Sequence, residues 1–175
     1  MNMKEKINMA NKNNYFTSPK GVAQYAWLNT PDTAFNQNAY KVALRMNKEE
    51  AKEFLDELQT VANDNLGGRA SEAHMPYKTD AETGEIVLTF KSKFKPKFCD
   101  ADGTIVSDEP SVGSGSCVKI KGSFYPYENS GVGISLQMSH VQVIDLVEHG
   151  GGQQFEPEEG SFKAAAGGDA NSYNF

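Results

Sequence analysis

The stretch GVGISLQMSHVQVIDLVEH, residues 131–149, indicates the fold more clearly than any other part of the chain. Side chains alternate across a strand, so a change in the phase of the apolar residues requires one extra residue. Such a change occurs here, and we predict a long strand with a bulge or sharp bend near Ser139 and His140. The two phases consist of Val132, Ile134, Leu136 and Met138, and then of Val141 and Val143.

Other segments alternate in the same way. Extended structure is expected at residues 22–28, 38–46, 85–100 and 113–127, with turn residues between these segments. Long, bent strands without a βαβ alternation favour a small closed or partly open barrel over a parallel sheet.

One segment, NKEEAKEFLDELQTVANDNLGG at residues 47–68, has the period of a helix. Its apolar residues form a single stripe, in which we place Ala51, Phe54, Leu55, Leu58, Val61 and Ala62. Asn47 is expected to cap the helix, with Glu50 three residues later, and Gly67 and Gly68 to end it. This helix is expected to pack on the barrel and to carry no chemistry.

The charge of the chain is unevenly distributed. The 175 residues carry 17 basic and 23 acidic side chains, a net charge of −6, which by itself does not indicate a nucleic-acid binder. Residues 153–175 hold one lysine against four acids and show no periodicity. We therefore expect a flexible arm at 1–14, a folded domain at 15–152 and an acidic disordered tail at 153–175 that ends in Phe175.

The sequence gives no sign of export, membrane insertion or a metal site. The N-terminal residues are polar where a signal peptide needs an apolar run, and we expect a soluble, cytoplasmic protein. Cys99 and Cys117 have no metal-ligand spacing, so reduced thiols and no cofactor are expected.

The stretch EIVLTFKSKFKPKFCD, residues 85–100, places four lysines on one side of an extended chain: Lys91, Lys93, Lys95 and Lys97. The phenylalanines at 90, 94 and 98 fall on the other side, which favours core positions for all three. A solvated sheet edge would explain one such row, because lysines discourage edge pairing. Two further rows, Lys119 with Lys121 and Lys41 with Arg45, have no carboxylates interleaved, and three such rows favour a polyanionic ligand.

Aromatic residues lie in or beside the extended segments. Proteins that bind single strands combine a cationic groove with aromatic platforms on which bases stack. Tyr125 and Tyr127 share the phase of Lys119 and Lys121 and are expected on the same face. Trp27 is a further candidate platform, although core or turn packing is the alternative for most of these rings.

Enzyme signatures are weak. His74, His140 and His149 are scattered, and neither HExxH nor GxSxG occurs. A metal-dependent nuclease using Asp100, Asp102 and Asp108 is an alternative, but a glycine turn explains the same residues. We therefore expect no enzymatic activity.

In the order and spacing of its segments, the chain resembles the single-stranded DNA-binding proteins of the T-odd bacteriophage replication type. The resemblance runs through FTSPKGVAQYAWLNTPD, YKVALRM, HMPYK, TFKSKF, GSGSCVKIKGSFYPY and VGISLQMSHVQVIDL. It implies a mainly β, five-stranded oligonucleotide-binding (OB) barrel with one helix. It also implies sequence-independent binding of single-stranded DNA, strand annealing and a possible homodimer, in phage replication and recombination in the host cytoplasm.

The resemblance also implies site residues. The matching segments assign DNA contacts to Lys93, Lys121 and Tyr127, and more loosely to Arg69. The family's acidic tail, which contacts polymerase and helicase-primase, corresponds here to Glu156, Glu158, Glu159, Asp169 and Phe175. Lys163 lies within this tail, and Lys95 stands where an aromatic residue is expected.

The full DNA-binding set expected from the residues and the resemblance together is Lys91, Lys93, Lys95, Lys97, Lys119, Lys121, Arg45, Arg69, Trp27, Tyr125 and Tyr127. The alternative class is an interaction or virion protein that does not bind DNA, in which the lysines only solubilise the barrel.

Overall fold

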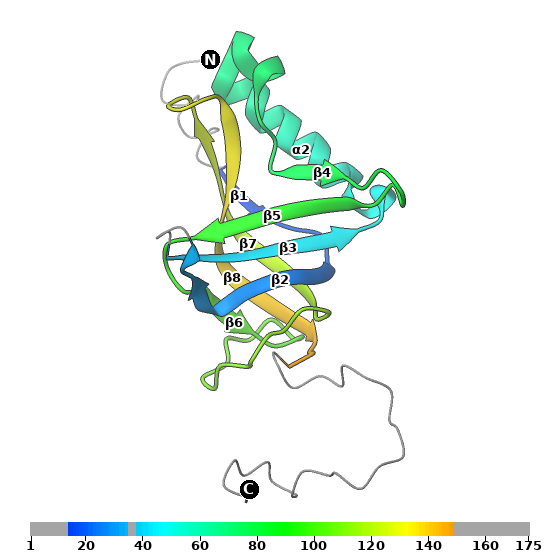
Figure 1. Cartoon of the computed structure of the whole chain (residues 1–175), viewed down its shortest axis with the longest axis vertical. Helices are drawn as coiled ribbons and strands as arrows, with labels where there is room; N and C mark the ends of the chain where they lie inside the picture. Colours follow the sequence, from blue (N-terminus) through cyan, green and yellow to red (C-terminus); the bar gives the residue numbers. More distant parts are fainter. Residues whose placement is uncertain (1–13, 35–37, 149–175) are drawn as a thin grey trace, which may run out of the picture.

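A computed structural model describes residues 14–34 and 38–148 (Figure 1). Ten helices and strands follow one another in these residues: β1 (Tyr15–Thr17), β2 (Gly21–Asp32), β3 (Ala39–Met46), α2 (Lys48–Leu66), the 3-10 helix η2 (Gly67–Glu72), β4 (Tyr77–Thr79), β5 (Ile86–Ser92), β6 (Lys97–Cys99), β7 (Cys117–Tyr127) and β8 (Gly133–Asp145).

Five strands close into a barrel, which confirms the predicted fold class. The strands pair in the order β7-β2-β3-β5-β8, and β8 returns to β7. All of these pairings are antiparallel except that of β5 with β8. Three short strands extend the barrel: β1 pairs with β7, β4 with β5, and β6 runs parallel to β8.

The predicted irregularity in the last strand is a bulge at Ser139. Lys121 of β7 lies opposite His140, whereas the next residue, Gly122, lies opposite Met138, so Ser139 is the extra residue. A side chain at position 122 would collide with the carbonyl of Gln137. Glycine therefore allows β7 and β8 to approach closely beside the bulge.

The barrel encloses an aromatic centre. Phe16 contacts Phe54, Phe90 and Phe124, with ring centroids 5.7, 5.7 and 5.1 Å away. Because Phe54 comes from α2, the helix seals one end of the barrel, beside the β7–β8 hairpin (Figure 1).

The helix forms as its sequence predicts. The Asn47 side chain accepts a hydrogen bond from the Glu50 amide at 2.7 Å, and Gly67 follows the last helical residue with a positive φ of 54°. Leu55 is only partly buried. The buried stripe is Ala51, Phe54, Leu58, Val61, Ala62 and Leu66.

Residues 85–100 differ from the single extended segment that was predicted. β5 ends at Ser92, and residues 93–96 turn before β6 begins at Lys97. Phe90 and Phe98 are buried, as predicted, but Phe94 is 80% exposed, so its predicted core position is wrong. Pro96, which cannot donate a hydrogen bond to a sheet, lies in this turn. It is buried, whereas Phe94 is exposed.

The predictions for the N-terminal arm and the acidic tail lie outside the described residues, apart from Asn14, whose carbonyl accepts a hydrogen bond from Phe124. Both cysteines are free thiols. In residues 14–34 and 38–148, no helix is long and apolar enough to cross a membrane.

Candidate functional site

The outer face of β8 forms a polar floor. Ile134, Leu136, Met138 and Val141 point into the core, so the residues between them face outward. The Gln137 amide donates a hydrogen bond to the Ser135 hydroxyl at 2.9 Å. After the bulge, the outward positions are taken by His140 and Gln142.

Strand register places lysines on both sides of this floor. Lys91 of β5 lies opposite Gln137, and Lys97 of β6 lies opposite His140. From the other side, β7 brings Lys121 opposite His140 and Lys119 opposite Gln142. We call this surface the β8 track; it comprises the outward side chains of residues 135–142 together with Lys91, Lys93, Lys97, Lys119 and Lys121.

Three hollows lie in sequence along the β8 track. The first, of about 170 Å³, is lined by Lys91, Tyr127 and Ser135. The second, of about 270 Å³, includes Lys93 and Gln137. The third, of about 300 Å³, is lined by residues that include Lys119, Lys121, His140, Gln142 and Ile105. Residues 134–142 span about 26 Å at about 3.3 Å per residue, so the surface suits an extended chain better than a compact ligand.

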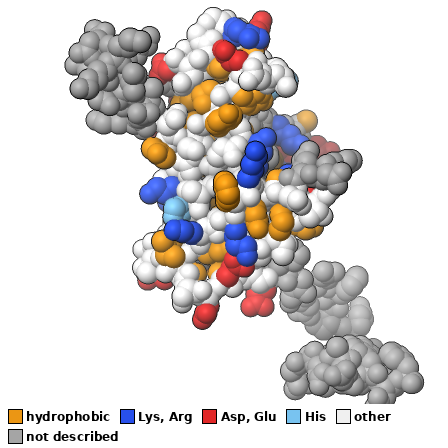
Figure 2. All heavy atoms as spheres, turned by 90° about the vertical axis from the view of Figure 1, so that its left-hand side faces the viewer, with side chains coloured by type: hydrophobic (Ala, Val, Ile, Leu, Met, Phe, Trp, Pro, Cys, Tyr) orange, Lys and Arg blue, Asp and Glu red, His pale blue; other side chains and the backbone are white. Residues whose placement is uncertain are grey.

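The lysines of the β8 track are not neutralised. Among the described residues, no carboxylate forms an ion pair with any of the five. Figure 2 shows basic and scattered hydrophobic side chains across the middle of one face, with acidic side chains towards its ends. The face therefore attracts polyanions although the whole chain is acidic.

Two exposed aromatic rings border the second hollow. Phe94 is 80% exposed and Tyr15 is 70% exposed, and both line this hollow beside Lys93. Sequence analysis missed both as candidates, because strict alternation placed Phe94 in the core. Pro96 was the available signal, since a proline inside an extended run breaks the pattern.

The predicted aromatic residues are divided between two places. Tyr127 is partly buried and reaches the first hollow, where a Cβ on Gly133 would collide with its ring. Trp27 is 40% exposed and lies opposite Lys41, which in turn lies opposite Lys91. Tyr125 is exposed and lies opposite Ser135, at the helix end of the β8 track, where it also lines a hollow with Leu66.

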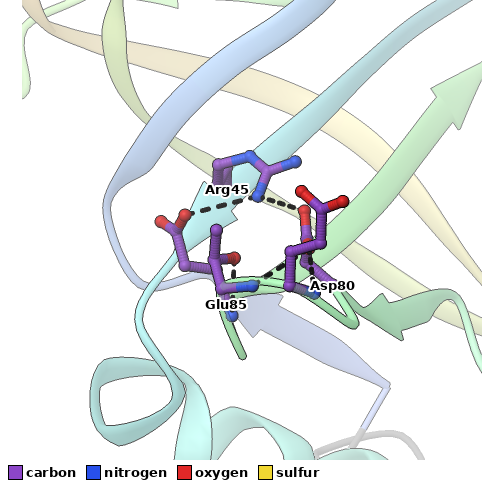
Figure 3. Close-up of polar contacts among 5 residues, drawn as sticks. Arg45, Asp80 and Glu85 are labelled. Carbon is purple, nitrogen blue, oxygen red and sulfur yellow. Dashed lines mark hydrogen bonds and ion pairs between the residues drawn. The ribbon is translucent and has the colours of Figure 1, made fainter.

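Arg45 is held by carboxylates (Figure 3), so the prediction that the Lys41–Arg45 row is unneutralised is wrong. The guanidinium donates to Asp80 at 3.0 Å and to Glu85 at 3.3 Å. The hydrogen bond to Asp80 is the main cause that raises the pKa of Arg45. In the same row, Lys41 pairs with Asp32 at 3.4 Å. Arg45 therefore fits a structural role better than a DNA contact.

Two other predicted contacts also have acidic partners. Lys95 pairs with Glu109 at 3.0 Å, and Arg69, in η2, pairs with Glu72 at 3.6 Å. Both pairs are exposed, so each contributes little and can open when an anion approaches.

The acidic turn after β6 has a structural explanation. The Asp100 carboxylate accepts hydrogen bonds from the amides of Asp102 and Thr104, both at 3.0 Å. Both amides donate to Oδ1, so Asp100 closes the glycine turn, as the turn interpretation predicts.

The chain is similar to the single-stranded DNA-binding proteins of two phages. It is 28% identical to that of Escherichia phage T7, over 89% of this chain and 88% of the relative. The protein of Enterobacteria phage T3 is 27% identical, over 88% and 87% of the two chains. These similarities confirm the resemblance predicted from the sequence motifs. No protein-family model matches.

Solved structures of phage single-stranded DNA-binding proteins are also similar to this chain. The crystal structure of the T7 protein, gp2.5, matches with a TM-score of 0.64 and 27% identity, over 86% of this chain and 98% of that one. The single-stranded DNA-binding protein of bacteriophage Enc34, in complex with single-stranded DNA, matches with a TM-score of 0.65 and 16% identity, over 80% and 91%. At 16% identity, the match to the Enc34 protein supports the fold alone.

Proposed function

We infer that this protein is a single-stranded DNA-binding protein of a bacteriophage, and that the β8 track is its DNA-binding surface. The observation that carries this inference is the set of five lysines that flank one polar floor and form no ion pair within residues 14–34 and 38–148. The similarity to the T7 and T3 proteins extends over nearly the whole chain, and both of those proteins are named as binders of single-stranded DNA.

Two kinds of contact follow from the chemistry of the track. The lysines bind phosphates and release counterions, which gives affinity without reading the sequence. The rings of Phe94, Tyr15 and Tyr127 border hollows beside lysines, where bases can stack on them. Every base has a π-face, so stacking tolerates any sequence. We assign Trp27 to the edge of this surface, through its register with Lys41 and Lys91.

The biological role that we propose is the protection and annealing of single strands in phage replication and recombination, in the cytoplasm of the infected cell.

The tail residues Glu156, Glu158, Glu159, Asp169 and Phe175 would contact polymerase and helicase-primase, and two copies would form a dimer. Binding of the polymerase to the full chain and to a chain ending at residue 152 tests the tail. Equal binding by both would contradict this role.

A salt titration tests the main proposal. The anisotropy of a labelled oligo-dT is measured with the full chain at several salt concentrations, with duplex DNA and oligo-U RNA as competitors. If four to six lysines meet phosphates, log affinity falls against log salt with a slope of about −3 to −4, at about 0.7 per contact. The duplex should compete poorly.

The other outcomes of this titration are equally informative. Absence of binding at physiological salt would favour an interaction or virion protein. Cleavage of the strand in magnesium would favour the nuclease alternative. Equal competition by RNA would show a binder of any single-stranded nucleic acid.

A further inference from the structure

The third hollow is lined by His140, which lies between two lysines of the neighbouring strands. His140 of β8 lies opposite Lys97 of β6 on one side and Lys121 of β7 on the other. Neighbouring strands are about 4.8 Å apart, so the three residues form a row about 10 Å wide.

We propose that Lys97, His140 and Lys121 form one phosphodiester-binding subsite, in which the His140 ring binds the phosphate as an imidazolium and DNA binding takes up a proton. This inference rests on the proposed function and goes beyond it, because it adds a residue and a pH dependence to the DNA-binding surface.

Hydrogen bonds around the bulge determine which ring nitrogen takes up the proton. The Ser139 hydroxyl donates to the Lys121 carbonyl at 3.1 Å, so its single proton is used. Its oxygen lies 2.9 Å from Nδ1 of His140, and with the hydroxyl proton directed to the carbonyl this oxygen accepts a hydrogen bond from Nδ1–H. In the neutral ring the lone pair is therefore on Nε2, and Nε2 takes up the proton.

In the absence of DNA, the surroundings favour the neutral form of the ring over the charged form. Partial burial is the main cause that lowers the pKa of His140, and the charges of Lys121 and Lys97 lower it further. Lys119 and the Cys99 thiol also line this hollow, and no carboxylate is among the described residues that line it. Among the residues that the structure describes, the ring therefore has no acidic partner, and a phosphate would supply the missing negative charge.

A bound phosphate reverses this balance. Its negative charge offsets the positive charges of both lysines, and one of its oxygens accepts a hydrogen bond from Nε2–H. The pKa of His140 therefore rises in the complex. A group whose pKa rises on binding strengthens binding at low pH, and this gain is lost as pH rises through the pKa of the complex. Each unit of rise gives up to a tenfold difference in affinity.

The test compares the full-length wild type, His140→Gln and His140→Lys on labelled oligo-dT, whose base does not protonate near neutral pH. Binding is measured at pH 6 and pH 8 over a range of salt. The wild type should bind about threefold to tenfold more tightly at pH 6, with a salt slope steeper by about 0.7 from one extra contact. Calorimetry in two buffers of different ionisation enthalpy should detect the proton taken up.

The two variants separate the charge of residue 140 from its structural role. His140→Gln should lose the pH difference, and His140→Lys should bind tightly at both pH values; circular dichroism checks that each is folded. An equal pH difference in the wild type and in His140→Gln would overturn the inference, as would an absence of proton uptake. Failure of the wild type to bind at either pH would instead contradict the proposed function.

Discussion

The β8 track and the Arg45 cluster both come from strands with alternating basic residues, yet they have opposite environments. Lys121 lies opposite His140, which separates it from Lys97, and it has no acidic partner among the described residues. Arg45 lies between Asp80 and Glu85, which come from the connection between β4 and β5. Basic alternation therefore predicts a binding surface only where the fold brings no carboxylates to it.

The largest expected effect comes from reversing a charge in the β8 track. Lys121→Glu should weaken oligo-dT binding by about 2–3 kcal/mol, because it removes a charge-assisted phosphate contact and adds repulsion. The slope of log affinity against log salt should become shallower by at least 0.7. Lys52→Glu, an equal charge change at an exposed position on α2, is the matched control. A similar loss in both variants would mean that only net charge matters.

A smaller effect is expected from the exposed ring of the track. Phe94→Ala should weaken binding by about 1–2 kcal/mol through lost stacking, while the salt slope stays as in the wild type. Because Phe94 is exposed, thermal stability should not change, whereas Phe90→Ala in the core should cost about 3–5 kcal/mol. Lys93→Ala, in the same turn, should instead make the slope of log affinity against log salt shallower. A lowered slope in Phe94→Ala would contradict this assignment of roles.

The smallest effect on DNA binding is expected from the Arg45 cluster. Arg45→Gln should leave oligo-dT affinity unchanged and alter stability alone. The pKa of Asp80 is lowered, mainly by the Glu82 amide and next by Arg45. Its stabilising contribution is therefore complete above the unfolded pKa and is lost as pH falls through the folded pKa.

Urea unfolding between pH 2 and pH 6 measures this contribution. The stability difference between the wild type and Arg45→Gln should shrink as the pH falls through the acid range. A clear loss of DNA affinity in the variant would return Arg45 to the binding surface.

Strong local periodicity made much of the fold predictable. The helix and the bulge at Ser139 follow from the spacing of apolar residues, and the Asn47 cap follows from the residue type before the helix. The row of lysines at 91–97 was also found, and all four are exposed. Phe94 was missed because Pro96 ends the alternation and turns the chain between β5 and β6.

The ion pairs could not be predicted in this way. Arg45 and Asp80 are 35 residues apart, and no local pattern relates them. His140 was set aside as a scattered histidine because its two lysine neighbours come from β6 and β7, which are also distant in the sequence.

The sequence by itself determined the helix and the phase of the long strands, because these depend on neighbours within a few residues. It also determined which side of each strand carries positive charge. Only the tertiary structure decided which of those charges remain unpaired, because pairing depends on strand register across the closed barrel. The same closure brought lysines from three strands around the floor of β8 and placed a histidine at their centre.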